Sequence, residues 1–258
     1  MSVPRSCPLC DSASHDVNVD YVVCPSCGLI FVRELPTREA MDDCYGGGLV
    51  RRVRRRLLAP FRRMWTHRNL AWCRQRANRI LGLIESEFEG KGAVRHLDVG
   101  CNKGYLLEAA LKKGWEPWGI EIAADMVAPF LNSYPEVRPR VVCGKFPEVA
   151  SELPAGTFDL ITAIDVIEHF TELLPGLEAL GGLLKPGGLL MVRTPDTTSV
   201  AARRDGAAWG ALKAVEHLNL VEPKLLDSIR TRLGFSGFGL LDDVVDDPES
   251  NLMAVLIK

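Results

Sequence analysis

The chain has 258 residues, of which 47% are hydrophobic and 25% are charged, and its formal net charge is −2. This composition is typical of a globular protein with one full hydrophobic core, and it excludes a disordered chain and a second large domain. No apolar stretch approaches the roughly 18 residues of a spanning helix, and the N-terminus lacks a charged region followed by an apolar run. We therefore expect no spanning helix, no signal peptide and a cytoplasmic location.

Four of the eight cysteines form two C-x-x-C pairs near the start of the chain, Cys7 with Cys10 and Cys24 with Cys27. This spacing is typical of a tetrahedral four-sulfur zinc site, which leaves no open position for catalysis. We predict a zinc ribbon over residues 1–35 that holds one structural Zn²⁺, with a redox dithiol pair as the alternative. The other cysteines lack ligand spacing and are expected to be small apolar side chains: Cys44, Cys73, Cys101 and Cys143.

Positive charge is concentrated in the following segment, which we assign as a helical arm over residues 36–90. Residues 51–79 contain eleven arginines and no acid, whereas the rest of the chain has 20 basic and 33 acidic residues. Six positions recur at three- and four-residue steps and predict an amphipathic helix: Leu57, Phe61, Met64, Trp65, Arg68 and Trp72. The arginines either lie solvated or paired with the acidic body, or they bind an anionic partner such as a phosphorylated glycan, a nucleotide-sugar, a nucleic acid, an acidic carrier protein or a membrane surface.

A short apolar segment, 94–98, ends in Asp98 and is followed by a turn that contains Gly100, Asn102 and Gly104. A buried strand that ends in an acid, then a glycine turn and the positive end of a helix, is the arrangement of a nucleotide-type cofactor site. The spacing does not match the dinucleotide fingerprint G-x-G-x-x-G. An acid at this position repels phosphate and suits a zwitterionic ligand that carries a sulfonium.

The turn resembles the first motif of class I S-adenosylmethionine-dependent methyltransferases, D-x-G-C-G-x-G-x-x-L, with Asn102 in place of the middle glycine. Asparagine tolerates left-handed backbone, so we expect the turn to survive. The resemblance continues with Glu121, at the end of a second strand where the family binds the ribose hydroxyls. It implies an S-adenosylmethionine site formed by Asp98, Gly100, Asn102, Gly104, Glu121, Ile122 and Asp165. A Rossmann-like domain without this function is the alternative.

Pattern and resemblance together predict an α/β fold over residues 91–258. We expect a doubly wound Rossmann-like sheet that is mostly parallel and ends in a C-terminal antiparallel hairpin. The parallel strands are expected at 94–98, 115–121, 141–143, 158–165 and 188–194, and the hairpin strands at 235–245 and 252–258.

Two histidines are candidates for a catalytic base. His217 follows Glu216 after the fifth expected strand, where the family places acceptor-facing loops, and His169 follows Glu168 just past the fourth. A base is needed only if the acceptor must lose a proton, and for each histidine a structural hydrogen bond is the alternative. Asp165, Glu168 and His169 also resemble the metal-binding set of quinone-biosynthesis O-methyltransferases, which implies Mg²⁺, although that family has glutamate at the first position.

These resemblances predict methyl transfer from S-adenosylmethionine to a small-molecule or carrier-linked acceptor, a sugar or glycan that is methylated at oxygen or carbon. Sugar C-methyltransferases with a four-cysteine ribbon support this interpretation. We expect an anionic acceptor, and any membrane contact is expected to be peripheral. RNA base methylation, which the arginine run favours, and a non-catalytic adaptor of the same fold, which Asn102 favours, are the alternatives.

Overall fold

The computed structural model describes residues 6–37, 39–41, 59–242 and 244–258, with the backbone alone over 59–69. The chain divides into two compact units, one formed by residues 1–36 and 153–258 and the other by residues 37–152. Across the described part of the chain, the helices are too short or too polar to span a membrane.

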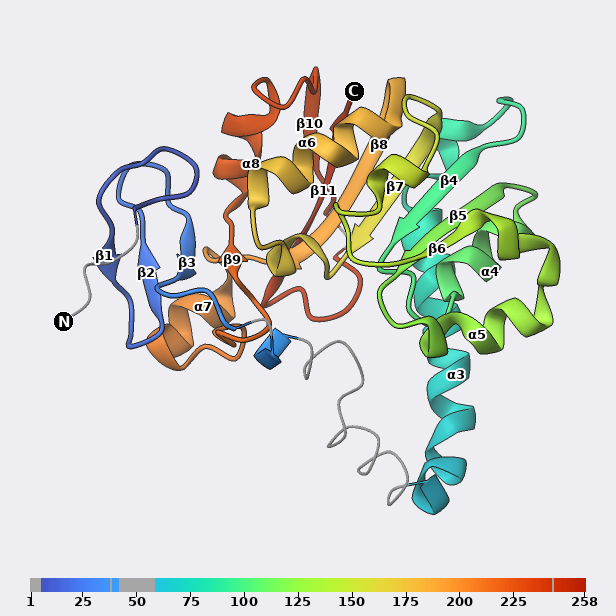
Figure 1. The fold of residues 1–258 in the computed structure, drawn as a ribbon, viewed down its shortest axis with the longest axis horizontal. Helices are drawn as coiled ribbons and strands as arrows, with labels where there is room; N and C mark the ends of the chain where they lie inside the picture. The colour runs from blue at the N-terminus through green and yellow to red at the C-terminus, as the bar shows by residue number, and fades with distance from the viewer. Residues whose placement is uncertain (1–5, 38, 42–58, 243) are drawn as a thin grey trace. The chain divides into compact units, whose positions relative to one another are not determined.

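Seven strands form one sheet in the order β10-β11-β8-β7-β4-β5-β6 (Figure 1). Their bounds are β4 Arg95–Val99, β5 Glu116–Glu121, β6 Val141–Cys143, β7 Phe158–Ile164, β8 Leu184–Pro195, β10 Gly237–Leu240 and β11 Asn251–Ile257. β5 pairs in parallel with β4 and β6, and β7 pairs in parallel with β8. β11 is antiparallel to both β8 and β10. This confirms the predicted α/β fold with its mostly parallel sheet and its antiparallel C-terminal hairpin.

The first strand of that hairpin is shorter than the sequence predicted, because β10 ends at Leu240 and the expected strand ran to residue 245. The carbonyl oxygens of Val245 and Asp246 accept hydrogen bonds from the side chain of Arg193, at 3.0 and 2.7 Å. Asp246 and Asp247 also have positive φ angles of 61° and 50°. The backbone groups of this segment are thus satisfied by a side chain and a turn in place of a strand partner.

The unit of residues 37–152 contains α3 Ala59–Gly82, α4 Tyr105–Lys112 and α5 Ala124–Ser133, together with β4, β5 and β6. A buried apolar cluster lies between the glycine turn, α4 and α5. Its members are Cys101, Leu107, Val127, Phe130, Leu131 and Val137. Burial raises the pKa of the Cys101 thiol, so this cysteine packs as a neutral apolar group, whereas the Cys143 side chain is exposed and lies outside the core.

Helix α3 lies within the predicted arginine-rich arm. Trp72 is the last residue of the predicted aromatic face and the only one of its six residues whose side chain is described. It is 52% exposed, so it faces solvent and is not part of a buried stripe. The Arg74 guanidinium pairs with Glu108 of α4 at 2.9 Å. Leu57, Phe61, Met64, Trp65 and Arg68, and the arginines before them, lie outside the residues whose side chains are described.

The unit of residues 1–36 and 153–258 contains α6 Leu173–Leu183, α7 Val200–Asp205 and α8 Pro223–Arg230, and a second, four-stranded sheet. This sheet has the order β1-β2-β3-β9, with β1 His15–Asp16, β2 Tyr21–Val23, β3 Ile30–Val32 and β9 Asn219–Leu220, and every pair in it is antiparallel. The predicted ribbon therefore takes its last strand from the C-terminal part of the chain. Strand β9 covers backbone groups of β3 that would otherwise form an open edge.

Candidate functional site

The glycine turn joins β4 to α4 with three residues in left-handed backbone. Gly100, Asn102 and Gly104 have φ angles of 74°, 49° and 75°. Asn102 thus adopts the conformation that a glycine would otherwise supply, as the sequence predicted. The amides of Gly100 and Cys101 both donate to the carbonyl oxygen of Ile120 at 2.9 Å. The turn is therefore anchored to the end of β5.

Glu121 holds this turn through its side chain. Its Oε2 accepts a hydrogen bond from the amide of Asn102 at 2.7 Å, and its Oε1 accepts one from the amide of Ala123 at 2.9 Å. A carboxylate offers about four lone-pair sites, so the pair of oxygens can still accept two hydroxyl hydrogens. The sequence analysis did not predict that Glu121 holds the backbone of the turn. The expected parallel pairing of the two strands that end at Asp98 and Glu121 is a signal that could have revealed it.

Asp98 and Ile122 lie beside the turn and complete the predicted cofactor set of this unit. Asp98 is buried and pairs in register with Gly119 of β5. Ile122 is 42% exposed, which leaves an apolar side chain at the surface next to Glu121. An acid, a second acid with free lone pairs and an exposed apolar group fit the sulfonium, the ribose and the adenine of S-adenosylmethionine in chemical type.

Gly104 has a packing reason that is independent of any ligand. A Cβ atom at this position would lie 2.5 Å from the Cγ atom of Phe130, and the positive φ angle disfavours other residues as well. Phe130 belongs to the apolar cluster under α5. The last glycine of the motif therefore lets α5 pack against the start of α4.

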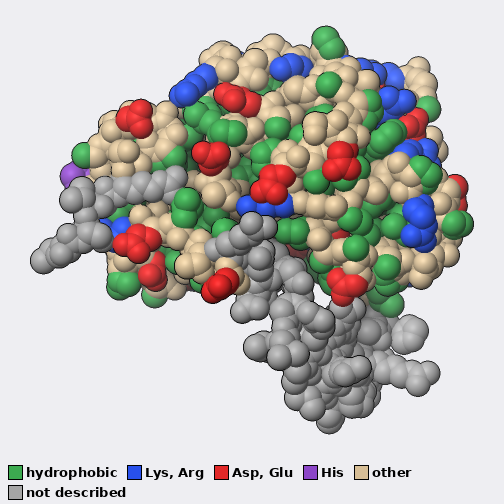
Figure 2. Space-filling view, in the orientation of Figure 1, with side chains coloured by type: hydrophobic (Ala, Val, Ile, Leu, Met, Phe, Trp, Pro, Cys, Tyr) green, Lys and Arg blue, Asp and Glu red, His purple; other side chains and the backbone are tan. Residues whose placement is uncertain are grey.

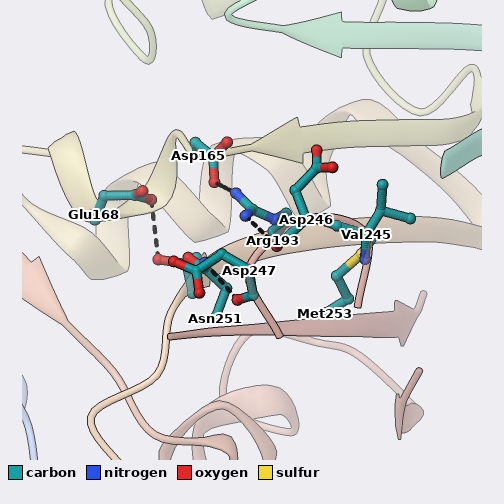
Figure 3. A network of polar contacts seen from close by, with 9 residues as sticks. Asp165, Glu168, Arg193, Val245, Asp246, Asp247, Asn251 and Met253 are labelled. Carbon is teal, nitrogen blue, oxygen red and sulfur yellow. Dashed lines mark hydrogen bonds and ion pairs between the residues drawn. The ribbon is translucent and has the colours of Figure 1, made fainter. Parts of the chain in front are cut away.

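Asp165 belongs to the other unit and is engaged by an arginine. It follows β7 with a φ angle of 58°, and its carboxylate forms an ion pair with Arg193 of β8 (Figure 3). Arg193 is buried and also donates to the carbonyl oxygens of Val245 and Asp246. Arg193 was not among the predicted site residues, because nothing in its strand sequence distinguishes it from a solvated arginine.

The two predicted histidines lie together with Glu168. One possible ligand atom from each of Glu168, His169 and His217 lies within 4.8 Å of the others, and the two imidazole centroids are 5.1 Å apart. Nδ1 of His169 lies 2.6 Å from the carbonyl oxygen of Glu216, and Nδ1 of His217 lies 2.8 Å from that of Ala211. Because a carbonyl oxygen only accepts, we infer that each Nδ1 carries hydrogen. Nε2 of His217 then has a free lone pair, as a base requires, whereas the His169 imidazole also meets a backbone group of Asp165.

Burial sets the charge state of this histidine cluster, which we define as Glu168, His169 and His217. Burial lowers the pKa of His217 to about 4, with a further decrease caused by His169, and burial also lowers the pKa of His169. Burial raises the pKa of Glu168 to about 8, and the charge of Asp165 adds to this increase. At neutral pH both imidazoles are therefore neutral. The Thr194 hydroxyl donates to Glu168 at 3.0 Å.

The described residues do not fit the magnesium site that the sequence resemblance implied. Mg²⁺ prefers a near-octahedral shell of oxygens. The histidine cluster offers one carboxylate and two imidazoles, and the carboxylate of Asp165 is paired with Arg193. The physical reason for this correction is the buried guanidinium, which already supplies the positive charge beside Asp165.

The four cysteines of the predicted ribbon lie together and fit a zinc ion. The Sγ atoms of Cys7 and Cys27 are 3.5 Å apart, as are those of Cys10 and Cys24, and all four sulfurs lie within 4.8 Å of one another. A tetrahedral ion with Zn–S bonds of about 2.3 Å separates its sulfurs by roughly 3.8 Å. The two knuckles therefore have the geometry of a closed structural site.

Comparison with known proteins agrees with this geometry. A family model described as "Methyltransferase domain" matches residues 51–237. A ubiquinone biosynthesis O-methyltransferase of Xanthomonas campestris is 36% identical over 111 residues, which are 42% of this chain and 45% of that protein. Another, from Idiomarina loihiensis, is 25% identical over 154 residues, which are 57% of this chain and 63% of that protein. The chain thus spans about half the length of the curated relatives that it matches.

Solved structures share the fold at low sequence identity. A SAM-dependent methyltransferase from Archaeoglobus fulgidus has a TM-score of 0.55 and 19% identity, over 72% of this chain and 94% of that one. An S-adenosylmethionine-dependent methyltransferase from Mesorhizobium loti has a TM-score of 0.54 and 14% identity, over 69% of this chain and 96% of that one.

Proposed function

The chain belongs to this methyltransferase domain family, and on that premise we propose that the protein transfers a methyl group from S-adenosylmethionine to a hydroxyl group of a small molecule. The curated relatives are named O-methyltransferases, which favours oxygen over carbon as the acceptor atom. S-adenosylmethionine supplies an already activated methyl group when it is bound, so the protein must bind it, align the acceptor and remove a proton.

Binding is assigned to the glycine turn and its neighbours. Glu121 would accept hydrogen bonds from the two ribose hydroxyls, and Ile122 would pack on the adenine ring. Asp98 places negative charge beside the positively charged part of the ligand. Gly100 and Asn102 would let the backbone of the turn approach the ligand closely, without a bulky side chain between them. The support for these roles is the geometry of the turn together with the family match.

One observation carries the choice of a hydroxyl acceptor, and it is the neutral imidazole of His217, whose Nδ1 faces the carbonyl oxygen of Ala211, beside His169 and the buried carboxyl of Glu168. A hydroxyl must lose its proton as its oxygen attacks the methyl carbon, and a positioned base accelerates such a step roughly 10²- to 10⁴-fold. We assign His217 as this base and His169 as the second candidate. Magnesium takes no part in this proposal.

The ribbon narrows the proposal further. We propose that Cys7, Cys10, Cys24 and Cys27 hold a structural Zn²⁺, and that the acceptor is a sugar or glycan hydroxyl, on an anionic molecule. The sugar assignment rests on the combination of a four-cysteine ribbon with the Glu216–His217 pair. On the face drawn in Figure 2, the acidic and basic side chains of the described residues are interspersed.

The proposal is tested with methyl-labelled S-adenosylmethionine and the zinc-loaded full chain. Three acceptor pools are offered separately: nucleotide-sugars, catechols and RNA. Label in the sugar pool supports the whole proposal, and label in catechols supports O-methylation but contradicts the sugar assignment. Label in RNA alone contradicts the small-molecule acceptor, and tight cofactor binding without transfer in any pool favours an adaptor.

A further inference from the structure

The zinc ribbon is joined by main-chain hydrogen bonds to the chain that directly follows His217. Strand β3 pairs with β9 in the register Phe31 to Asn219, and the amide of Val32 donates to the carbonyl oxygen of Leu218 at 3.1 Å. In Figure 1, β3 accordingly lies between β2 and β9. The segment that presents His217 is thus continuous with a strand of the ribbon sheet.

Tyr21 of β2 contacts the histidine segment directly. Its side chain is fully buried, and its hydroxyl donates a hydrogen bond to the carbonyl oxygen of His217 at 2.7 Å. The amide of Tyr21 is in turn held by Oδ1 of Asn18 at 2.9 Å. Burial raises the pKa of the Tyr21 phenol, so it remains a neutral donor across the working range of pH. A buried donor of this kind holds its acceptor in one place.

The opposite side of the same segment is held by the turn that carries Glu168 and His169. The amide of Leu218 donates to the carbonyl oxygen of Glu168 at 2.7 Å, and Nδ2 of Asn219 donates to that of Phe170 at 2.6 Å. The imidazole of His169 meets the carbonyl oxygen of Glu216, as described above. The histidine segment therefore lies between the ribbon and the turn after β7, with hydrogen bonds to both.

We propose that Tyr21 is a positioning residue, and that through it the zinc ribbon sets the orientation of the His217 imidazole. This inference rests on the proposed function, in which His217 is the base. The hydroxyl of Tyr21 fixes the peptide at His217, and this peptide directs the ring so that Nδ1 meets Ala211 and Nε2 stays free. The alternative is a purely structural role, in which the hydrogen bond of Tyr21 only satisfies its buried hydroxyl and stabilises the ribbon.

The test is Tyr21→Phe in the zinc-loaded full chain, which removes one oxygen and keeps the ring. We expect kcat to fall roughly 10- to 100-fold, because a small misplacement of a catalytic group has an effect of this size. The affinity for S-adenosylmethionine, measured by calorimetry, should stay unchanged. Nitrogen NMR should show the His217 ring changing from a single Nδ1–H tautomer to a mixture of both, which a purely structural role would not produce.

Val22→Ala is the matched control. Val22 is the next residue of β2 and is also fully buried, but its side chain has no hydrogen bond to offer the histidine segment. The substitution should lower the thermal midpoint of the ribbon at least as much as Tyr21→Phe does. We expect it to leave kcat and the His217 tautomer unchanged.

Two results would overturn the inference. The first is a Tyr21→Phe protein with the kcat and the single tautomer of the unmodified protein. The second is a Val22→Ala protein whose kcat falls, and whose His217 ring becomes a mixture of tautomers, to the same extent as in Tyr21→Phe. General stability of the ribbon would then explain the behaviour of both variants. A full kcat in His217→Asn would instead contradict the proposed base, and the tautomer measurement on Tyr21→Phe would still decide the positioning role independently.

Discussion

The glycine turn and the histidine cluster are held by contacts between residues that differ greatly in their separation along the sequence. In the turn, Glu121 holds amides that lie 19 residues before it and two residues after it. In the cluster, His169 meets a carbonyl oxygen 47 residues away, and Tyr21 reaches across 196 residues to His217. A site built within one strand-helix-strand unit depends on that unit alone. A site built from distant segments depends on every element that holds those segments, and here this includes the ribbon.

Removal of the ribbon metal should have the largest effect and should separate the two sites. Structural zinc contributes about 10–16 kcal/mol of binding free energy, which is folding free energy for its module. We expect Cys24→Ser to lose its zinc. Turnover should fall at least roughly 100-fold, since the segment that carries His217 then loses its partner strand in the ribbon. Binding of S-adenosylmethionine should persist. Metal analysis, calorimetry and a turnover assay measure the three quantities.

Cys143→Ser is the control for this experiment, because Cys143 is an exposed cysteine outside the ribbon. It should retain zinc and turnover. The comparison between the two sites fails if the zinc-free protein turns over normally, or if cofactor binding is lost together with the metal. A freshly purified, unchelated protein without zinc would contradict the metal assignment itself.

Replacement of the proposed base should have the next largest effect. In His217→Asn the amide nitrogen can still donate to the carbonyl oxygen of Ala211, but the free Nε2 is lost. We expect kcat to fall roughly 10²- to 10⁴-fold. The same change at His169 should have a smaller effect. His15→Asn, at an exposed position of β1, controls for the substitution and should match the unmodified protein. Equal losses at His169 and His217 would show that neither alone is the base.

Loss of the Glu121 carboxylate should weaken the local site without reaching the distant one. Glu121→Ala removes acceptors for two hydroxyls, which amounts to about 1.5–3 kcal/mol, or roughly a 10- to 150-fold loss of affinity for S-adenosylmethionine. Calorimetry measures the affinity, and the His217 tautomer should not change. Glu136→Ala, at an exposed position, is the control. An unchanged affinity in Glu121→Ala would reject the ribose assignment.

The pH dependence of activity should report the buried environment of the histidine cluster. Because the pKa of His217 is about 4 and the ordinary value is 6.5, kcat/KM should stay nearly flat as the pH falls from 7 to about 5. A solvated histidine would lose most of its activity over this range. A midpoint near 6.5 would show that the base is a different, exposed group.

Stability should depend on pH in two opposite ways at this cluster. The folded-state pKa of His217 is lowered, so its contribution is present above 6.5 and is lost as the pH falls toward about 4. The folded-state pKa of Glu168 is raised, so its contribution is present below 4.5 and is lost as the pH rises through about 8. In the unmodified protein, the thermal midpoint should fall as the pH rises toward about 8. In Glu168→Gln this fall at high pH should be absent. A decline that persists in this variant would assign it to another group.

The smallest effect is expected for RNA binding by the arginine-rich arm. Each phosphate that a protein neutralises lowers the logarithm of affinity by about 0.7 to 0.9 per tenfold increase in salt. We expect weak binding and a shallow slope between roughly 50 and 200 mM salt. Tight binding with a slope that indicates six or more phosphate contacts would overturn the small-molecule acceptor.

Local patterns in the sequence were sufficient for the sheet, the cysteine pairs and the glycine turn. Each depends on residues that are near neighbours in the chain or on one repeating period, so residue type and spacing alone carry the information. The left-handed backbone at Asn102 is an example, because it follows from the amide side chain and its place in the motif. The ends of strands such as β10 could not be predicted, because Arg193 satisfies the backbone there.

Only the tertiary structure decided how the histidine cluster is held. The pairing of β3 with β9, the ion pair of Arg193 with Asp165 and the bond from Tyr21 to His217 each join distant segments. The acceptor of the Tyr21 bond is a backbone carbonyl oxygen, which every residue has, so no residue type marks it in the sequence. The sequence therefore determined which groups are candidates for the proposed chemistry, and the folded chain decided how those groups are held.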